Sequence, residues 1–547
     1  MFGSKKNTKY IFVAGGVMSA IGKGITASSI AKIMQSRGLK VTALKIDPYV
    51  NVDAGTMTPT EHGEVFVLAD GMECDQDMGN YERFLDTDLT RDNYMTTGSV
   101  YLSVITKERN LEYGGRNVEV VPDIPNEVIA KIDAAVAATD SDVAVVEVGG
   151  TVGEYQNVLF LEAYRILKFH HPGDCAFMLV SYLPVLNGEL KSKPTQYAVR
   201  SVNAAGIVPD VVIARSASVI DAKRKERIAF NCSLHVEEII SAPNVESIYE
   251  VPINFEDQGL GELLAKKLGL GGRDRDMKEW RGLVDTIHAA TEPIKIAIAG
   301  KYFTTGEYVL TDSYISVLEA IKHAAYQQAR KPVIEWVNVE DFEKDPSQLS
   351  KLDQYGGVIV PGGFGDRGVE GKIAVIQYCR EKKIPYLGLC YGMQLMVVEY
   401  ARHIAGMTDA NTTEVDPKTT HPVIDILPEQ KELLAKKQYG ASMRLGNYPA
   451  TLKQGTIVRE QYGKDEVIER HRHRYEVNPE YIAEIEKAGL VFSGTSPSRK
   501  LMEFAELPKD KHPYFVGTQA HPELISRPLR PHPLFAGLIA AAIDRKV

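Results

Sequence analysis

Short apolar runs alternate with helical patterns along the first half of the chain, and this alternation limits its fold more than any other feature. The runs are rich in Val and Ile and are nearly continuous, without a polar residue at every second position. Such runs are typical of parallel strands that are buried on both faces. The strands expected on this basis are residues 10–14, 41–46, 118–121, 142–148, 176–182 and 211–214.

The segment between the first two runs has a helical pattern. Residues 25–37 place Ile30, Ile33 and Met34 on one face, and Gly38 is a suitable C-terminal stop. A strand, a helix and a second strand in this order predict a parallel sheet. A second strand series follows in the other half of the chain, so the predicted fold class is α/β, with two doubly wound, mostly parallel-sheet domains. That series comprises residues 294–299, 333–337, 357–360 and 386–389.

The boundary between the two halves is expected at a polar, glycine-rich stretch, residues 269–276. We predict one domain at residues 1–270 and another at 294–547. The linker between them, residues 271–293, contains a short amphipathic segment around Trp280. A chain of 547 residues is too long for one compact core, which agrees with this division.

Composition excludes several classes of protein. Apolar residues make up 44% and charged residues 25%, the mix of an ordinary globular protein. The net charge of −9 gives no general attraction to nucleic acid or to anionic membranes. Five cysteines without a C-x-x-C pair make a poor disulfide framework, so we expect a reducing, cytoplasmic environment. No signal-peptide pattern or run of 18 apolar residues is present, and membrane spanning is not expected.

The first expected strand runs into a glycine-rich loop, Gly15-Gly16-Val17-Met18-Ser19-Ala20-Ile21-Gly22-Lys23-Gly24, and then into the expected helix. Backbone N–H groups in such a loop approach phosphate oxygens closely, and Lys23 can reach the terminal phosphates of a nucleotide. The spacing departs from the standard P-loop, because Gly24 stands where a metal-binding Ser or Thr is usual. Thr26 can substitute for that hydroxyl.

Acidic residues are the expected Mg²⁺ ligands. Glu147 comes at the end of strand 142–148, and Asp77 ends a cluster with Asp70, Glu73 and Asp75. One or two carboxylates together with substrate phosphates suit Mg²⁺. The alternative for the 70–77 cluster is a solvated acidic loop.

A third segment, residues 188–196, follows an apolar strand and contains two lysines, a Thr and a Gln. It can bind a triphosphate, or it is a surface loop.

A cysteine elbow in the second half resembles the turn that exposes a nucleophile. The expected strand at 386–389 leads into Gly388-Leu389-Cys390-Tyr391-Gly392-Met393-Gln394, and the glycines permit a sharp turn into a helix. The helix N-terminus favours the thiolate, and the N–H of Tyr391 faces the developing oxyanion. The alternative, a small buried cysteine, suits Cys379 better, because it does not require this glycine spacing.

A candidate base lies in His521-Pro522-Glu523, after an expected strand at 515–520. In an extended chain His521 and Glu523 lie on one side, so Glu523 can orient the imidazole that deprotonates Cys390. A second glycine turn, Pro361-Gly362-Gly363-Phe364-Gly365, can supply another oxyanion N–H.

The segment 469–478 is rich in Arg and His. It is either a basic patch or, more simply, an anchor for the carboxylate of a small substrate.

Together these motifs resemble those of the CTP synthase family, whose second domain is a class I, triad-type glutamine amidotransferase. The resemblance covers nearly the whole chain, in family order. The motifs that carry it are residues 15–24, Lys45-Ile46-Asp47-Pro48-Tyr49, His62-Gly63-Glu64-Val65-Phe66, Glu147 to Gly153, 191–196, 470–478, and the cysteine elbow with His521-Pro522-Glu523.

The resemblance implies a reaction and its ligands. ATP phosphorylates O4 of UTP, and ammonia released from glutamine displaces the phosphate to give CTP in pyrimidine biosynthesis. Mg²⁺ is the implied metal, ATP a co-substrate, GTP an activator and CTP a feedback inhibitor. The family is typically homotetrameric and also forms filaments. Nucleic acid and membrane are not among the implied partners.

The resemblance also implies site residues in the first domain. Lys23 is catalytic, and Asp77 and Glu147 bind the metal. The ATP-binding set is Ala20, Ile21, Gly22, Lys23, Gly24, Ile25, Asp77, Pro243, Asn244 and Val245. The UTP- and CTP-binding set is Ser19, Glu154, Tyr155, Gln156, Lys191, Ser192, Lys193, Pro194, Thr195, Gln196 and Arg227.

In the second domain the resemblance implies a catalytic triad of Cys390, His521 and Glu523. The glutamine-binding set is Gly363, Tyr391, Gly392, Met393, Gln394, Glu414 and Arg474. His62 and Val65 resemble the family's ammonia-channel constriction.

The chain departs from the family pattern at several positions. Arg227 stands where the family has Lys, and Tyr391 replaces a smaller residue. Pro243 cannot donate a backbone hydrogen bond to adenine. Residues 303–308 form a longer segment beside the region linked to GTP.

Two alternatives to this function stay open at the level of sequence. One is another ATP-dependent amidoligase fused to a glutaminase, such as a cobyrinic-acid-type synthase. The other is a partition-type P-loop protein with an inactive glutaminase. Residues 191–196 and the long N-terminal match argue against the first, and the intact triad argues against the second.

Overall fold

The chain forms two compact units. The computed structural model describes residues 8–58, 63–271, 274–301, 304–305, 308–309, 311–426 and 443–545. Unit 1 contains Met1–Ala54 and Asp77–Asp285, and unit 2 contains Gly55–Gln76 and Thr286–Val547. The short segment Gly55–Gln76 therefore belongs to the same unit as the C-terminal half of the chain, which no sequence pattern predicted.

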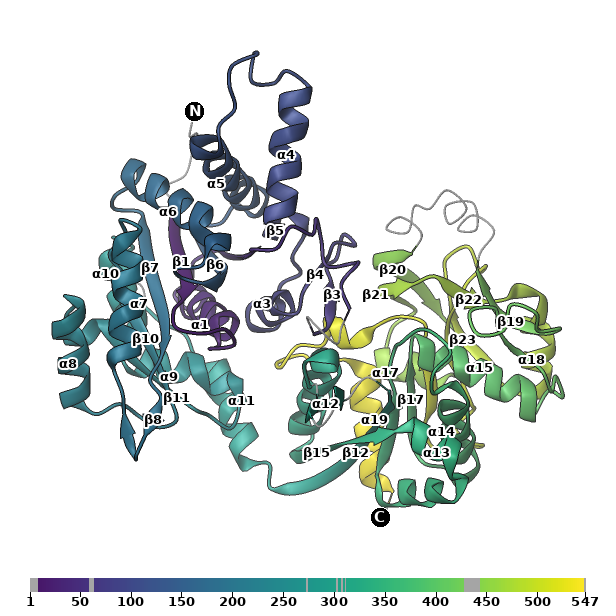
Figure 1. Ribbon diagram of the computed structural model, residues 1–547. Helices are drawn as coiled ribbons and strands as arrows, with labels where there is room; N and C mark the ends of the chain where they lie inside the picture. The colour runs from purple at the N-terminus through teal and green to yellow at the C-terminus, as the bar shows by residue number, and fades with distance from the viewer. Residues whose placement is uncertain are drawn as a thin grey trace. The chain divides into compact units, whose positions relative to one another are not determined.

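Unit 1 is built on a seven-stranded sheet in which every pair of neighbouring strands is parallel. The strand β1 lies at its centre, between β7 and β6 (Figure 1). In sheet order the strands are β11 (Ile239–Pro243), β10 (Val211–Ser216), β7 (Cys175–Tyr182), β1 (Lys9–Gly15), β6 (Val143–Thr151), β2 (Val41–Asp47) and β5 (Tyr94–Thr96).

The central strands of unit 1 are buried on both faces. Tyr10, Phe12 and Ala14 belong to the core on one face of β1, and Ile11 and Val13 are buried on the other. The helices of this unit are α1 (Lys23–Gln35), α3 (Asp77–Leu85), α4 (Thr97–Arg109), α5 (Val120–Thr139), α6 (Val158–His170), α7 (Lys193–Ala204), α8 (Ala222–Cys232), α9 (Val251–Asp257), α10 (Leu260–Lys267) and α11 (Lys278–Ala289).

Most strands expected in the first half are confirmed, but the one at 118–121 is wrong. Helix α5 begins at Val120, and Val120 and Val121 are 59% and 44% exposed. The β-branched residues suggested a strand. Pro122 and Pro125 suit the first turns of a helix and cannot donate to a central sheet ladder.

Unit 2 is built on a nine-stranded mixed sheet. Its first five strands are parallel, and four antiparallel strands extend it. In sheet order they are β15 (Arg330–Asn338), β12 (Glu292–Gly300), β16 (Gly357–Val360), β17 (Tyr386–Leu389), β25 (Phe515–Thr518), β24 (Met502–Glu506), β23 (Val491–Thr495), β20 (Arg444–Leu452) and β21 (Glu466–His473).

Two apolar clusters occupy opposite faces of this sheet. Ala297 and Val358 belong to one cluster, and their neighbours Ile298 and Ile359 belong to the other. The helices are α12 (Ile315–Gln327), α13 (Val339–Lys344), α14 (Val369–Lys382), α15 (Tyr391–His403), α17 (Ile457–Tyr462), α18 (Ile482–Ala488) and α19 (Pro533–Asp544).

Smaller sheets complete unit 2. β18 (Asn411–Thr412), β19 (Pro422–Ile426) and β22 (Tyr475–Val477) form one, and the hairpin of β3 (Val65–Val67) and β4 (Glu73–Asp75) forms another. The α/β class with mostly parallel sheets, predicted from the apolar runs, is confirmed.

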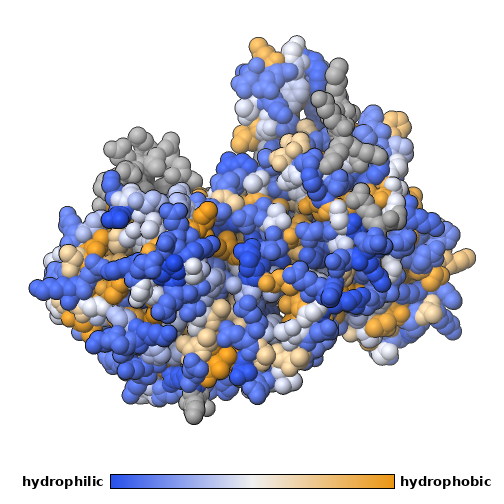
Figure 2. Space-filling view, turned by 180° about the vertical axis from the view of Figure 1, so that it is seen from behind, coloured by the Kyte–Doolittle hydropathy of each residue, from blue (hydrophilic) through white to orange (hydrophobic). Residues whose placement is uncertain are grey.

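The surface is predominantly polar. Hydrophilic residues cover most of the face shown in Figure 2, and hydrophobic residues are scattered over it. Among the described helices, none is both long enough and apolar enough to cross a membrane.

Candidate active sites

Cys390 lies at the sharp turn between β17 and α15, where the sequence predicted an elbow. Its φ of 50° and ψ of −102° are unusual for a residue with a side chain and belong to a strained turn. The residue is 5% exposed. The thiol points to the carbonyl oxygen of Arg472, with 3.8 Å between Sγ and O. The turn therefore holds the sulfur in a fixed position at the wall of a pocket.

His521 and Glu523 form the pair that the sequence predicted, although the expected extended geometry is wrong. Residues Pro522–Ile525 form a 3₁₀ turn, which a proline at its first position favours. Nδ1 of His521 lies 2.7 Å from Oε1 of Glu523. The backbone N–H of His521 donates to Arg470 O at 2.7 Å, so β21 fixes the position of the histidine.

The charge state of His521 follows from its neighbours. Burial lowers its pKa, but the Glu523 and Cys390 charges outweigh that effect and raise the pKa well above its ordinary value. Cys390 is the second side chain that hydrogen-bonds to His521 and raises its pKa. The imidazole is thus oriented by Glu523 on one side and placed to exchange a proton with Cys390 on the other.

These three residues share a pocket of about 100 Å³ that lies entirely within unit 2. Gly362 and Gly363 form part of its wall, and a Cβ atom on Gly362 would lie 2.8 Å from Cε1 of His521. Glycine at 362 is therefore required for the close approach of the turn and the imidazole. The lining residues are Glu64, Val65, Ser313, Tyr314, Gly362, Gly363, Phe364, Cys390, Arg472, His521, Glu523 and Leu524.

The carbonyl groups of the glycine turn 361–365 are held by side chains. Tyr314 donates to Gly362 O at 3.2 Å, Lys301 to Phe364 O at 2.6 Å and Tyr391 to Gly365 O at 3.0 Å. The turn is consequently fixed before any substrate arrives, as a preorganised oxyanion site requires. Tyr391, which stands where the family pattern has a smaller residue, thus has a structural role through its hydroxyl group.

Of the other expected glutamine-binding residues, Glu414 contacts the same turn. Glu414 accepts the Gly365 N–H at 2.8 Å, and Arg474 is one of the cations that lower its pKa against the larger effect of burial. Gln394 donates to Tyr475 O at 2.9 Å. Met393 is fully buried on α15.

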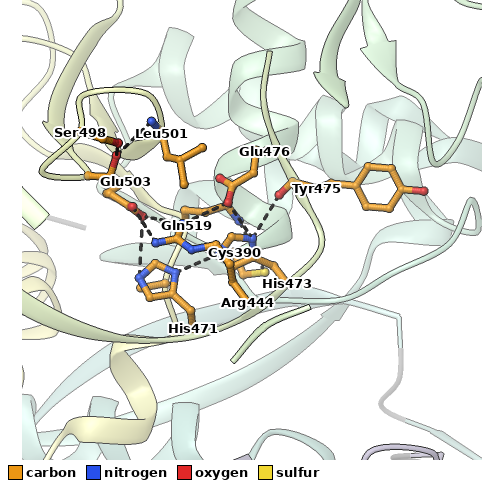
Figure 3. A network of polar contacts seen from close by, with 12 residues as sticks. Cys390, Arg444, His471, His473, Tyr475, Glu476, Ser498, Leu501, Glu503 and Gln519 are labelled. Carbon is orange, nitrogen blue, oxygen red and sulfur yellow. Dashed lines mark hydrogen bonds and ion pairs between the residues drawn. The ribbon is translucent and has the colours of Figure 1, made fainter. Parts of the chain in front are cut away.

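A buried network of charged groups lies behind the nucleophile (Figure 3). Arg444 pairs with Glu476 at 3.0 Å and with Glu503 at 2.9 Å, and all three side chains are at most 11% exposed. Nδ1 of His471 lies 2.9 Å from Nε2 of His473. Burial lowers the pKa of both imidazoles well below the ordinary value, so this pair is neutral.

In the basic segment 469–478, two of the arginine side chains make contacts inside unit 2. Arg470 donates to Val67 O at 2.6 Å, and Arg472 pairs with Glu73 at 2.9 Å. Both contacts attach the hairpin of β3 and β4 to β21. Arg474 acts electrostatically on Glu414, another expected glutamine-binding residue.

In unit 1, the glycine-rich loop leads from β1 into α1, and Lys23 opens the helix. Its Nζ donates to Gly150 O at 2.9 Å, on the strand that carries Glu147. Burial lowers the pKa of Lys23, and Glu147 and Asp77 partly oppose that effect. Residues Val17–Ala20 of the loop, including Ser19, are exposed.

The two expected metal ligands converge on a single lysine. Nζ of Lys45 lies 2.5 Å from Oδ2 of Asp77 and 2.8 Å from Oε1 of Glu147, and Tyr81 also donates to Glu147. Burial raises the pKa of Glu147. At Asp77 burial acts in the same direction, but the charge and hydrogen bond of Lys45, together with smaller effects of Asn80 and Lys23, outweigh it and lower the pKa. Lys45 belongs to a motif that carried the family resemblance, but sequence analysis gave it no role.

Gly24 explains the departure from the standard P-loop. A Cβ atom at this position would lie 2.0 Å from Oδ1 of Asp77, so only glycine admits the carboxylate. Asp77 thus occupies the space beside the loop where a Ser or Thr is usual. Asp70, Glu73 and Asp75, the other members of the acidic cluster, belong to unit 2.

A cavity of about 350 Å³ lies beside the phosphate loop. Gly22, Ile25, Thr26 and the expected adenine contacts Pro243, Asn244 and Val245 line it. Sequence analysis missed Arg215, which donates to Ala242 O at 2.9 Å, Pro243 O at 3.0 Å and Asn244 Oδ1 at 3.1 Å. The sequence signal for Arg215 is its charged side chain near the C-terminal end of strand β10, because ligands bind at this end of the strands in such sheets.

The expected UTP- and CTP-binding residues fall into two groups. Lys191 pairs with Glu189 at 2.5 Å, and Arg227 helps to lower the pKa of the same carboxyl, so these two cations lie near one another. Thr195 accepts from Ser181 at 3.0 Å, and Gln196 donates to Ser192 at 3.1 Å. Glu154, Tyr155 and Gln156 form a second group on the surface, and Lys193 and Pro194 open α7.

Some expectations fall outside the described residues. His62 is one, and residues 303, 306 and 307 of the segment 303–308 are the others. Val65, the second expected channel residue, lines the Cys390 pocket.

The comparisons with known proteins identify first the class of the second half. A family model described as glutamine amidotransferase class-I matches residues 309–541, which include the cysteine elbow and the His521–Glu523 pair. A solved glutaminase domain of Trypanosoma brucei CTPS with bound acivicin is 34% identical. It matches 46% of this chain and 95% of its own, with a TM-score of 0.42.

The first half gives the family. A model described as CTP synthase N-terminus matches residues 9–270. CTP synthase of Pyrococcus furiosus is 50% identical over 543 residues, 98% of each chain. That of Methanocaldococcus jannaschii is 48% identical over 550 residues, 99% of this chain and 100% of its own. The chain belongs to the CTP synthase family.

Proposed function

We propose that this chain catalyses the ATP-dependent amination of UTP to CTP in pyrimidine biosynthesis, with glutamine or free ammonia as the nitrogen source. The observation that carries the proposal is the presence of two chemically different centres in one chain. A thiol, an imidazole and a carboxylate line one pocket in unit 2. A phosphate loop, Lys23 and two carboxylates meet in unit 1.

Glutamine is hydrolysed at the unit 2 centre. His521 takes the thiol proton of Cys390, whose sulfur attacks the side-chain amide carbon of glutamine, and Glu523 keeps the imidazole oriented. The backbone N–H groups of Gly363 and Tyr391 stabilise the oxyanion. Ammonia leaves, a thioester forms, and water releases glutamate and restores the thiol. Gln394, Glu414 and Arg474 hold the amino-acid end of the substrate, and Gly392 and Met393 shape the turn.

The synthetase centre in unit 1 transfers the γ-phosphoryl group of ATP to O4 of UTP, and ADP leaves. Lys23 stabilises the charge that spreads over the transferring group. Ammonia then attacks C4 of the pyrimidine and inorganic phosphate departs, which yields CTP.

Asp77 and Glu147 would hold Mg²⁺ together with the nucleotide phosphates. The pair fits this ion, because both carboxylates already face one cationic atom, Nζ of Lys45. The ion supplies neutralisation of phosphate charge.

Nucleotide recognition is assigned from the cavity and from the family pattern. Ala20 to Ile25 bind the ATP phosphates, and Pro243, Asn244 and Val245 contact adenine. UTP and the inhibitor CTP bind at overlapping triphosphate sites, formed by Ser19, Glu154–Gln156, Lys191–Gln196 and Arg227.

Several further features rest on family membership. GTP acts as an activator, the enzyme is a homotetramer that can assemble into filaments, and it works in the cytoplasm. The synthetase domain is assigned to residues 1–270, the linker to 271–293 and the glutaminase domain to 294–547. The segment Gly55–Gln76, which packs in unit 2, carries the ammonia-channel residues His62 and Val65.

The product assay tests the proposed function. Purified protein is incubated with UTP, ATP, Mg²⁺ and glutamine, and the nucleotides are separated and identified. We expect CTP, ADP, phosphate and glutamate in equal amounts. Glutamate formation without any CTP, under conditions in which ATP and UTP bind, would rule the function out.

A further inference from the structure

One buried lysine beside the thiol centre has no assigned role. Lys372 lies in the first half of α14, and none of its surface is exposed to solvent. Its Nζ has no hydrogen-bond partner among the described residues. An ammonium group that is buried without a partner is costly, so its presence beside a reactive centre calls for a functional reason.

Lys372 lies close to both residues that are expected to donate hydrogen bonds to the oxyanion. A Cβ atom on Gly363 would lie 3.3 Å from Nζ of Lys372, so the amine packs directly behind the glycine turn. The same Nζ lies 5.0 Å from the ring centroid of Tyr391, the residue that follows the nucleophile. The amine therefore contacts the glycine turn at Gly363 and the side-chain ring of Tyr391, the two residues whose N–H groups would receive the oxyanion.

The charges around Lys372 favour its protonated form when the site becomes negative. Burial, together with the smaller effect of the Lys301 charge, lowers its pKa to about 7. Cys390 and Glu414 act in the opposite direction. A negative charge on the sulfur or on a substrate oxygen would strengthen that opposing effect and hold the proton on Lys372.

We propose that Lys372 is a positioning residue of the glutaminase centre, whose buried charge acts through the backbone of Gly363 and Tyr391 to stabilise negative charge during glutamine hydrolysis. The inference rests on the proposed function and adds a cation that neither the triad nor the glutamine-binding set includes. One charge at about 6–8 Å in a medium of effective dielectric about 20 changes a rate by roughly ten- to a hundredfold.

The test compares Lys372→Met with Lys382→Met. Methionine keeps the length and apolar stem of lysine and removes the charge. Lys382 is the matched control, because it ends the same helix, is exposed and lies 5.8 Å from the ring of Tyr378. Steady-state glutamine hydrolysis and ammonia-dependent CTP synthesis are measured for each variant.

We expect Lys372→Met to lower kcat for glutamine about ten- to a hundredfold with little change in KM, and to retain ammonia-dependent synthesis. Lys382→Met should match the wild type. The deficit should be largest below about pH 7 and should narrow as the pH rises, because the wild-type lysine then loses its own charge. A role in packing alone predicts no deficit and no pH trend, and that result would overturn the inference.

Two further variants, Lys372→Gln and Cys390→Ala, distinguish the remaining outcomes. If Lys372→Met loses ammonia-dependent synthesis as well, Lys372→Gln replaces it, because glutamine keeps a polar end without the charge. Cys390→Ala is run in parallel. Glutamine hydrolysis that survives in Cys390→Ala contradicts the proposed function itself, whereas wild-type kcat in the uncharged Lys372 variants contradicts only the role of Lys372.

Discussion

The phosphoryl centre of unit 1 and the thiol centre of unit 2 arrange their charged groups in opposite ways. In unit 1, Asp77 and Glu147 both contact Lys45, so opposite charges neutralise one another inside the protein. In unit 2, His521 lies between Glu523 and Cys390, and Nζ of Lys372 has no hydrogen-bond partner in the described part of the chain. From this comparison we predict that the fold alone preassembles the thiol centre, whereas the charged groups of the unit 1 centre exchange partners when nucleotide phosphates bind.

The largest effect is expected at the phosphoryl centre, from Lys23→Ala. This change removes a compact positive charge from the developing phosphoryl transition state. CTP formation should fall by roughly a thousandfold or more, equally with glutamine and with ammonia, because the step precedes the arrival of nitrogen. Both rates are measured by nucleotide separation.

The control for Lys23 is Lys40→Ala, which removes an exposed lysine paired with Asp140 and should leave both rates unchanged. Near wild-type turnover of Lys23→Ala with ammonium salts would show that the phosphate-loop assignment is wrong.

A smaller effect is expected from Arg215→Met, because this side chain supports the cavity wall rather than the reacting atoms. Three hydrogen bonds from Arg215 hold residues 242–244 in place. Their loss should raise KM for ATP about tenfold and change kcat little. Arg165→Met removes an arginine that pairs with Glu162 one turn away and is the matched control. An unchanged KM for ATP would show that this cavity is not part of the ATP site.

The smallest effect is expected from Lys191→Met in the proposed UTP and CTP site. The Lys191–Glu189 pair is exposed to solvent, so its loss should change folding stability little. KM for UTP and the inhibition constant for CTP should rise together, by several-fold to about tenfold, because the two nucleotides share a triphosphate. A shift in one constant without the other would separate the two sites.

Much of the fold could be predicted, because buried parallel strands have a recognisable pattern in the local sequence. Continuous apolar runs and glycines at or near strand ends identify β1, β6 and β17 without knowledge of their partners. The same rule failed at residues 118–121, where Val120 begins a helix. Two β-branched residues indicate a buried strand only if other elements pack over them. The local sequence does not show whether such packing occurs.

The parts of the sites that were missed depend on contacts between distant residues. Lys45 reaches Asp77 across 32 positions, and Arg472 reaches Glu73 across 399. No local pattern encodes such pairs. The nucleophile elbow and the His-Pro-Glu motif were predictable, because their chemistry requires short and fixed spacings. The His521–Glu523 contact was foreseen, but its 3₁₀ geometry was not.

The central claim is that the two centres perform separate steps, and Cys390→Ala tests it most directly. CTP synthesis is measured with glutamine and with ammonium chloride at mildly alkaline pH, in protein shown to be folded by its thermal transition. Because the triad acts as a unit, the glutamine-dependent rate should fall by several orders of magnitude, while the ammonia-dependent rate stays near wild type. Equal loss with both nitrogen sources would contradict the account.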